Sequence, residues 1–115
     1  MRNLFAMTLV AVLFLLLAQA DARADDSTIG TVGPGGTRVY TVTANPGAIA
    51  SIVVIGNGNT DLDLFVYDAC GRLLGSDTDA SDNCLVIVRV PCNGRLQVEI
   101  ENLGSCCNRF ALIVR

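Results

Sequence analysis

The chain has 115 residues, with 8 basic residues, 11 acidic residues, no histidine and a formal net charge of −3. All the basic residues are arginine, so lysine is absent as well. Without histidine, Ser-His-Asp and Cys-His catalysis and histidine-ligated zinc are excluded, and without lysine so is Schiff-base chemistry. A mildly acidic chain without basic clusters also argues against nucleic acid and anionic membranes as partners. We therefore expect a protein that is not an enzyme.

The first residues have the pattern of an export signal. A positively charged start precedes an apolar run over residues 4–18, and small residues in an A-x-A pattern end at Ala20 and again at Ala24. The run is about 15 residues long, short of the roughly 20 that span a membrane. We predict a signal peptide over residues 1–24, cleaved after Ala20 or Ala24, and one domain over residues 25–115. The mature protein is expected outside the cell, in the periplasm or in the cell envelope, without membrane contact.

The rest of the chain alternates between apolar and polar residues with a period of two, the pattern of half-buried strands. The expected strands are 37–43, 48–55, 61–68, 72–76, 85–90, 95–102 and 109–115. Turn residues separate them, including an ACGR turn in which Asp68 is expected to bond the backbone and Gly71 to supply the turn glycine. Short strands at this spacing predict an all-β fold, an antiparallel, jelly-roll-like β-sandwich of about 7–8 strands.

The order of motifs resembles a known family. The stretch IGTVGPGGTRVYTV, the NPG turn, the unit DLDLFVYDACG, an acidic loop, a P-x-x-G turn and a closing aromatic strand together resemble the bacterial pre-peptidase C-terminal domain over residues 29–115. Leu96 stands where that family often has an aromatic residue, and the cysteines are not part of its usual pattern. The resemblance implies a β-sandwich module of secreted hydrolases. We therefore expect a secreted, non-catalytic module that binds or stabilises an exported protein or an extracellular polymer.

Five carboxylates are expected at one end of the sandwich. If consecutive strands are antiparallel, Asp61 and Asp63 lie at the same end as Asp77, Asp79 and Asp82. Hard oxygen ligands suit calcium, and extracellular calcium sites are weak, with a Kd of about 10⁻⁴ to 10⁻³ M. The alternative is a solvated acidic loop in which the first two aspartates bond backbone amides. Both interpretations stay open, and calcium is the only cofactor that the sequence indicates.

The five cysteines all follow the signal peptide, in a compartment where disulfides form. The strand directions put Cys70 and Cys92 at one end of the sandwich, and Cys84, Cys106 and Cys107 at the other. Disulfides need Cα atoms within about 7 Å, whereas a strand of six residues spans about 20 Å. We predict the pair Cys70–Cys92 and a pair of Cys84 with Cys106 or Cys107. The unpaired thiol suggests an alternative function, a disulfide-linked dimer or assembly protein of the cell envelope.

Overall fold

The fold is known from a computed structural model that describes residues 19–23 and 26–115. Most of the predicted signal peptide therefore lies outside the described residues, and its cleavage stays a prediction. Within the predicted signal, Gln19–Arg23 forms strand β1, which pairs in parallel with the strand that begins at Thr37.

Nine strands make up the described part of the chain, and no helix there could span a membrane. They are β1 (Gln19–Arg23), β2 (Asp26–Val32), β3 (Thr37–Thr43), β4 (Ile49–Ile55), β5 (Leu62–Tyr67), β6 (Leu73–Asp77), β7 (Asn83–Arg89), β8 (Arg95–Asn102) and β9 (Asn108–Val114).

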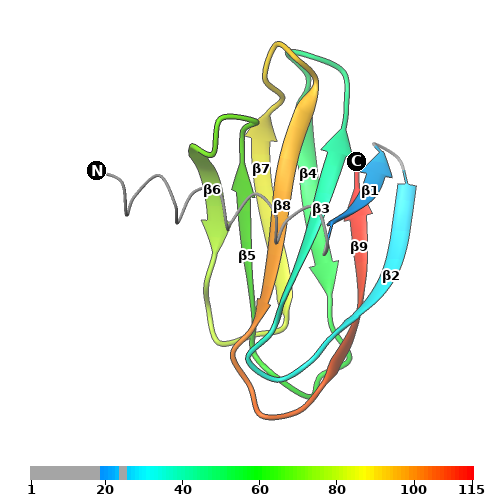
Figure 1. Cartoon of the computed structure of the whole chain (residues 1–115), viewed down its shortest axis with the longest axis vertical. Helices are drawn as coiled ribbons and strands as arrows, with labels where there is room; N and C mark the ends of the chain where they lie inside the picture. Colours follow the sequence, from blue (N-terminus) through cyan, green and yellow to red (C-terminus); the bar gives the residue numbers. More distant parts are fainter. Residues whose placement is uncertain (1–18, 24–25) are drawn as a thin grey trace, which may run out of the picture.

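The strands form two sheets that pack face to face (Figure 1). Sheet A has the order β1-β3-β8-β5-β6, and sheet B has the order β2-β9-β4-β7. From β2 onward every pairing is antiparallel, and the chain changes sheet at each connection except the β5–β6 hairpin. This order is that of a jelly roll. The predicted all-β sandwich is confirmed, with β1 and β2 added to the seven expected strands.

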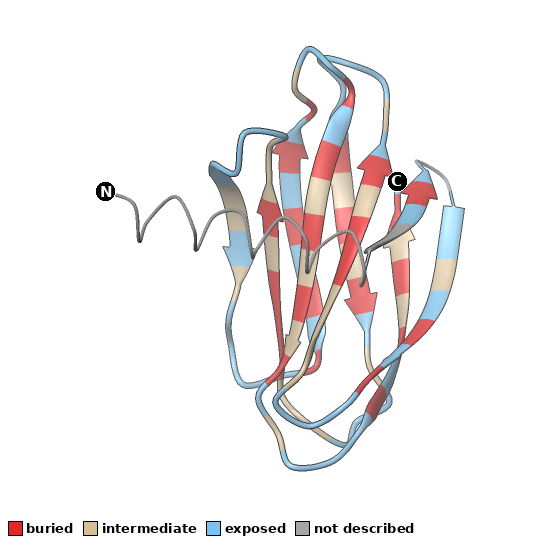
Figure 2. Ribbon diagram, in the orientation of Figure 1, coloured by how far each residue is buried: buried red, intermediate tan, exposed pale blue. Residues whose placement is uncertain are grey.

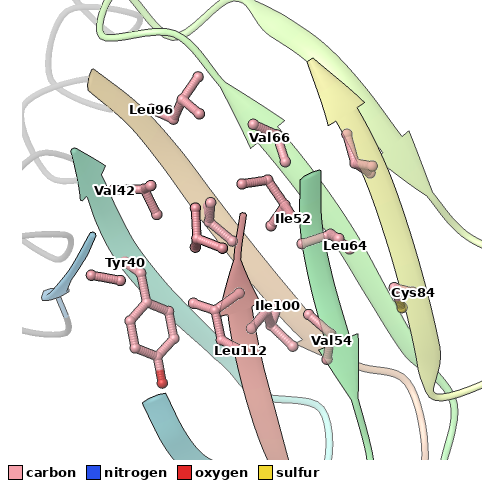
Figure 3. Packing of buried hydrophobic residues seen from close by; sticks show 14 of the residues in the cluster. Tyr40, Val42, Ile52, Val54, Leu64, Val66, Cys84, Leu96, Ile100 and Leu112 are labelled. Atoms are coloured by element: carbon pink, nitrogen blue, oxygen red, sulfur yellow. The ribbon is translucent and has the colours of Figure 1, made fainter. Parts of the chain in front are cut away.

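The core lies between the sheets because each strand turns alternate side chains inward. Strand β7 alternates strictly between buried and exposed residues along its length (Figure 2). The inward side chains of both sheets meet in one aliphatic cluster (Figure 3). Its fully buried members include Val42, Ile52, Val54, Leu62, Leu64, Val66, Leu96, Val98, Ile100 and Leu112.

Two aromatic rings fill the core where β2, β3 and β9 meet. Tyr40 and Phe110 are each 1% exposed, and their rings pack edge to face with centroids 6.3 Å apart. Gly30 on β2 lies against both rings, so that a Cβ atom there would come within 2.7 Å of the Phe110 ring. The Tyr40 hydroxyl is buried without a hydrogen-bond partner among the described residues, and burial raises the pKa of this phenol. The aromatic packing in this part of the core therefore leaves one buried hydroxyl group without a hydrogen bond to the described residues.

Candidate functional site

Several acidic residues lie around the start of β5, which is at the lower end of the sandwich in Figure 1. Asp63 points away from the core and lies directly opposite Glu101 of β8 in the strand register. Its side chain is only 7% exposed, and its Oδ1 has no hydrogen-bond partner among the described residues. Burial raises the pKa of Asp63, and the charges of Asp61, Glu101, Asp77 and Asp79 raise it further. The site therefore concentrates negative charge around one buried carboxylate.

The other aspartates of the site divide into two kinds. Asp61 precedes β5, and its Oδ1, like that of Asp63, is buried and has no hydrogen-bond partner among the described residues. Asp77 accepts a hydrogen bond at Oδ2 from the backbone N–H of Leu85 (2.9 Å), and Asp79 accepts one at Oδ1 from Ser81 (3.0 Å). Asp77 and Asp79 thus already form hydrogen bonds with the backbone around the turn that leads into β7. Asp61, by contrast, has a buried oxygen to which no described group donates a hydrogen bond.

Asp82 takes part in a separate network that ties together three loops. Its Oδ2 accepts hydrogen bonds from the Gly58 N–H (2.6 Å) and from Nδ2 of Asn108 (2.9 Å). Nδ2 of Asn108 also donates to the Thr60 hydroxyl (3.1 Å), and its Oδ1 accepts from the Asn57 N–H (3.2 Å). Both Asp82 and Asn108 are buried. Asp82 therefore holds the loop between β4 and β5 in place, a role that accounts for its carboxylate without a metal ion.

These placements fit the calcium hypothesis in part. Two buried carboxylate oxygens without donors, on Asp61 and Asp63, are the ligand type that calcium prefers. Within the described ranges, however, no three acidic or cysteine side chains are grouped so as to hold a metal ion. Glu101 belongs to the site although the sequence interpretation did not include it. Its position on the polar side of the alternating segment RLQVEIEN was the signal that could have indicated it.

Asp68 and Gly71 form the turn at the upper end, between β5 and β6. The Asp68 Oδ1 accepts hydrogen bonds from the backbone N–H groups of Cys70 (2.9 Å) and Arg72 (2.8 Å), and Gly71 has a φ of 87°. Arg72 also forms an ion pair with the Asp68 Oδ2 at 3.3 Å. The bonds from Arg72 and Cys70 lower the pKa of Asp68. This carboxylate therefore holds the hairpin in its conformation.

The cysteines lie at the two ends of the sandwich. Cys70 and Cys92 occupy turns at the upper end, while Cys84, Cys106 and Cys107 lie at the lower end (Figure 1). All five are thiols in the structure, and all except Cys84 are exposed. The predicted pairs Cys70–Cys92 and Cys84 with Cys106 or Cys107 therefore stay predictions.

Cys84 differs from the other cysteines because its side chain belongs to the core. It is 3% exposed and its Sγ donates a hydrogen bond to the Leu62 carbonyl at 3.2 Å. Burial and then the neighbouring aspartates raise the pKa of this thiol to about 12.

The outer face of sheet B is aliphatic, a feature that the sequence interpretation missed. The outward positions of β4 and β7 include Ile49 and Ile87, which are 58% and 60% exposed. The register places further apolar side chains beside them, and we call the whole set the aliphatic face: Ile29, Ile49, Val53, Ile55, Leu85, Ile87, Ala111 and Ile113. Residues 48–55 are apolar on both faces, a pattern typical of a central strand that is buried on both sides. β4 is central in its sheet, but one of its faces is open to solvent.

Charged side chains lie on the outer faces of both sheets. Arg89, Arg109 and Arg115 border the aliphatic face, and no outward position of sheet B is acidic. The outer face of sheet A carries side chains of both signs, the acidic Asp63, Glu99 and Glu101 and the basic Arg23 and Arg95, together with the half-buried rings of Phe65 and Tyr67. In the part of the chain that the structure describes, the only ion pair joins Arg72 to Asp68. Among the described residues, the charged side chains of the two outer faces therefore have no ion-pair partner.

The architecture defines the protein as a jelly-roll β-sandwich domain, and comparison with solved structures agrees. The pre-peptidase C-terminal domain of a collagenase from Bacillus anthracis is similar over 84% of this chain and 94% of its own, with a TM-score of 0.66 and 12% identity. CorA, a surface-associated copper-binding protein of Methylomicrobium album BG8, is similar over 85% of this chain and 99% of its own (TM-score 0.61, 9% identity).

A third similar structure is PliG of Aeromonas hydrophila, a periplasmic inhibitor of g-type lysozyme. It covers 85% of this chain and 100% of its own, with a TM-score of 0.52 and 13% identity. The sequence matches no family model and no curated protein. At these identities the similarities establish the fold, and the first of them agrees with the family that the sequence resembles.

Proposed function

We propose that this protein is an exported, non-catalytic module that binds another protein through the aliphatic face of sheet B. The observation that carries the proposal is the exposure of Ile49, Ile55, Leu85 and Ile87 on adjacent central and edge strands. The largest contiguous apolar patch on a soluble monomer is typically about 300 to 600 Å² and is often an interaction site. The similar structures support the non-catalytic role and the location, because they include a module of a collagenase, a periplasmic inhibitor and a surface protein.

Site-specific photo-crosslinking tests this proposal in the cell that exports the protein. A photoreactive residue at Ile87 should give covalent adducts with another polypeptide, seen as bands of higher mass. The matched control is Leu103, which is 54% exposed but lies in the loop between β8 and β9. Adducts from Ile87 and none from Leu103 are the expected result. Equal yields at the two positions, or none at Ile87, would contradict a binding role for the aliphatic face.

The acidic site supports a second role for the lower end of the sandwich, the binding of calcium as a stabilising ion. Asp61 and Asp63 would supply the two buried oxygens that lack donors, with Asp77 or Asp79 as further ligands. A bound cation would neutralise the repulsion between these carboxylates. At free calcium about 100 times the Kd, binding would add about 2.7 kcal/mol to the free energy of unfolding. Thermal unfolding in EDTA and in millimolar calcium tests this, and an unchanged midpoint would leave only a solvated acidic cluster.

The exposed cysteines favour the alternative of a disulfide-linked assembly. Cys70, Cys92, Cys106 and Cys107 are all accessible in an oxidising compartment. If one of them links two chains, the exported protein should migrate as a dimer on a non-reducing gel and as a monomer after reduction. Peptide mapping would identify the cysteine and would test the predicted Cys70–Cys92 pair at the same time. A monomer under both conditions would contradict the assembly role.

A further inference from the structure

We infer that the outer edge of β3 is a binding site for an extended peptide strand, which adds to sheet A parallel to β3 and inserts one small side chain into the core. In the structure this place is taken by the chain's own strand β1 (Figure 1). The inference goes beyond the proposed function, because it concerns the edge of sheet A and not the aliphatic face. It rests on the predicted cleavage after Ala24, which removes β1 from the exported protein.

Strand β1 shows how a peptide fits this edge. It pairs in parallel with β3 over all of its five residues. Ala22 is 5% exposed and belongs to the core cluster, and the register sets it beside the fully buried Val42. Asp21 and Arg23, which flank Ala22 in the chain, are exposed. A peptide bound here therefore needs a small residue at the inward position, because a larger one would overpack the core, while the neighbouring positions accept polar side chains.

The edge of β3 has none of the features that usually protect an edge strand. On its other side β3 pairs with β8 over seven residues in one unbroken register. Its sequence, TRVYTVT, contains no proline, glycine or lysine and is rich in β-branched residues. Edge strands are commonly protected by proline, lysine, bulges or a short length, and β6, at the opposite edge of sheet A, is five residues long and has an irregular register with β5. β3 is therefore suited to pairing on both sides.

Cleavage of the signal peptide determines whether this edge is covered. A cut after Ala24 removes every residue of β1, whereas a cut after Ala20 leaves Ala22 in the chain. Loss of β1 leaves the backbone groups on one side of β3 without their strand partner and uncovers the core beside Val42. An extended segment of another exported polypeptide can replace β1 there, since the addition of a strand to a free sheet edge is a recurring mode of peptide recognition.

Titration of the exported protein with synthetic peptides tests the inference, once intact mass has shown that the chain begins at Asp25. The probe is QADARA, the sequence of residues 19–24, with blocked termini. In NMR spectra, binding should shift the backbone amide signals of β3 and slow their hydrogen exchange. The same peptide with Ala22→Glu carries a charge at the core position and should bind at least tenfold more weakly. The peptide with Asp21→Ser, changed at an exposed position, is the matched control and should bind like the original.

A form of the protein that begins at Gln19 provides a second control, because it keeps β1 and should not bind the peptide. Equal binding by this form, or by the peptide with Ala22→Glu, would overturn the inference. An exported chain that begins at Asp21, or no shift in the β3 signals at about 1 mM peptide, would overturn it as well. Crosslinking from Ile87 tests the proposed function separately, because that residue lies on β7 in sheet B.

Discussion

Replacing Asp82 by alanine should destabilise the domain by about 3 kcal/mol. The buried Oδ2 of Asp82 accepts hydrogen bonds from the Gly58 N–H at 2.6 Å and from Asn108 Nδ2 at 2.9 Å. A hydrogen bond with one charged partner contributes about 1.5 to 3 kcal/mol, and the alanine variant loses both bonds. The loss stays below the sum because Asn108 keeps its bond to Thr60 and water can reach the exposed Gly58.

Urea unfolding followed by circular dichroism measures this change, since the chain has no tryptophan to report on folding. Asp82→Asn is the conservative control, because it keeps an oxygen acceptor without the charge, and it should lose about half as much. Asn108→Ala completes a double-mutant cycle, in which the two residues should show a coupling of about 1 to 2 kcal/mol. A loss below about 0.5 kcal/mol for Asp82→Ala, or fully additive single changes, would refute the network as described. A loss that appears only with calcium would instead make Asp82 a metal ligand.

Three further changes have definite expected outcomes. Tyr40→Phe removes a buried hydroxyl without a partner and should raise the free energy of unfolding by about 1 kcal/mol; a lower stability would mean that the hydroxyl has a bonding partner. The pKa of Asp63 is raised in the folded protein, so folding favours the protonated carboxyl. Its contribution to the free energy of unfolding is therefore complete at low pH and is lost as the pH rises through the folded-state pKa. Asp63→Asn should therefore raise the urea midpoint at about pH 7 and change it little near pH 3, well below the ordinary aspartate pKa of about 3.9. In the reduced protein at about pH 8, iodoacetamide should modify the exposed cysteines but not Cys84, because only thiolates react; mass spectrometry of native and urea-unfolded samples checks this.

The alternation of residues was enough to predict most of the strands and the face that each turns inward. In residues 61–68 the alternation puts Leu62, Leu64 and Val66 on one face and Asp63 on the other, and in the structure the first of these faces is the one packed in the core. It also gave the antiparallel direction of successive strands. A strand can be predicted from its own residues, because the alternation of side chains between its two faces appears directly in its sequence.

The parts that sequence reasoning missed depend on which strands become neighbours. Glu101 joins the acidic site only because β8 pairs with β5, and nothing in residues 61–82 indicates this. The open face of β4 was missed for a related reason. An apolar run on both sides of a strand is typical of burial on both faces, but among the described residues no further layer covers the outer side of sheet B. The hydrogen bond that Asp82 accepts from Asn108 could not be predicted either, because it joins residues far apart in the chain.

The position of β9 within sheet B bears on the time at which the domain can fold. Although β9 is the last strand in the chain, it lies between β2, near the start of the described domain, and β4. Until Val114 has left the ribosome or the export machinery, β2 has no strand to pair with and the β4–β7 hydrogen-bonded pair has an open edge. Contacts between residues so far apart in sequence are slow to form. The domain should therefore acquire its structure only after the whole of β9 is free.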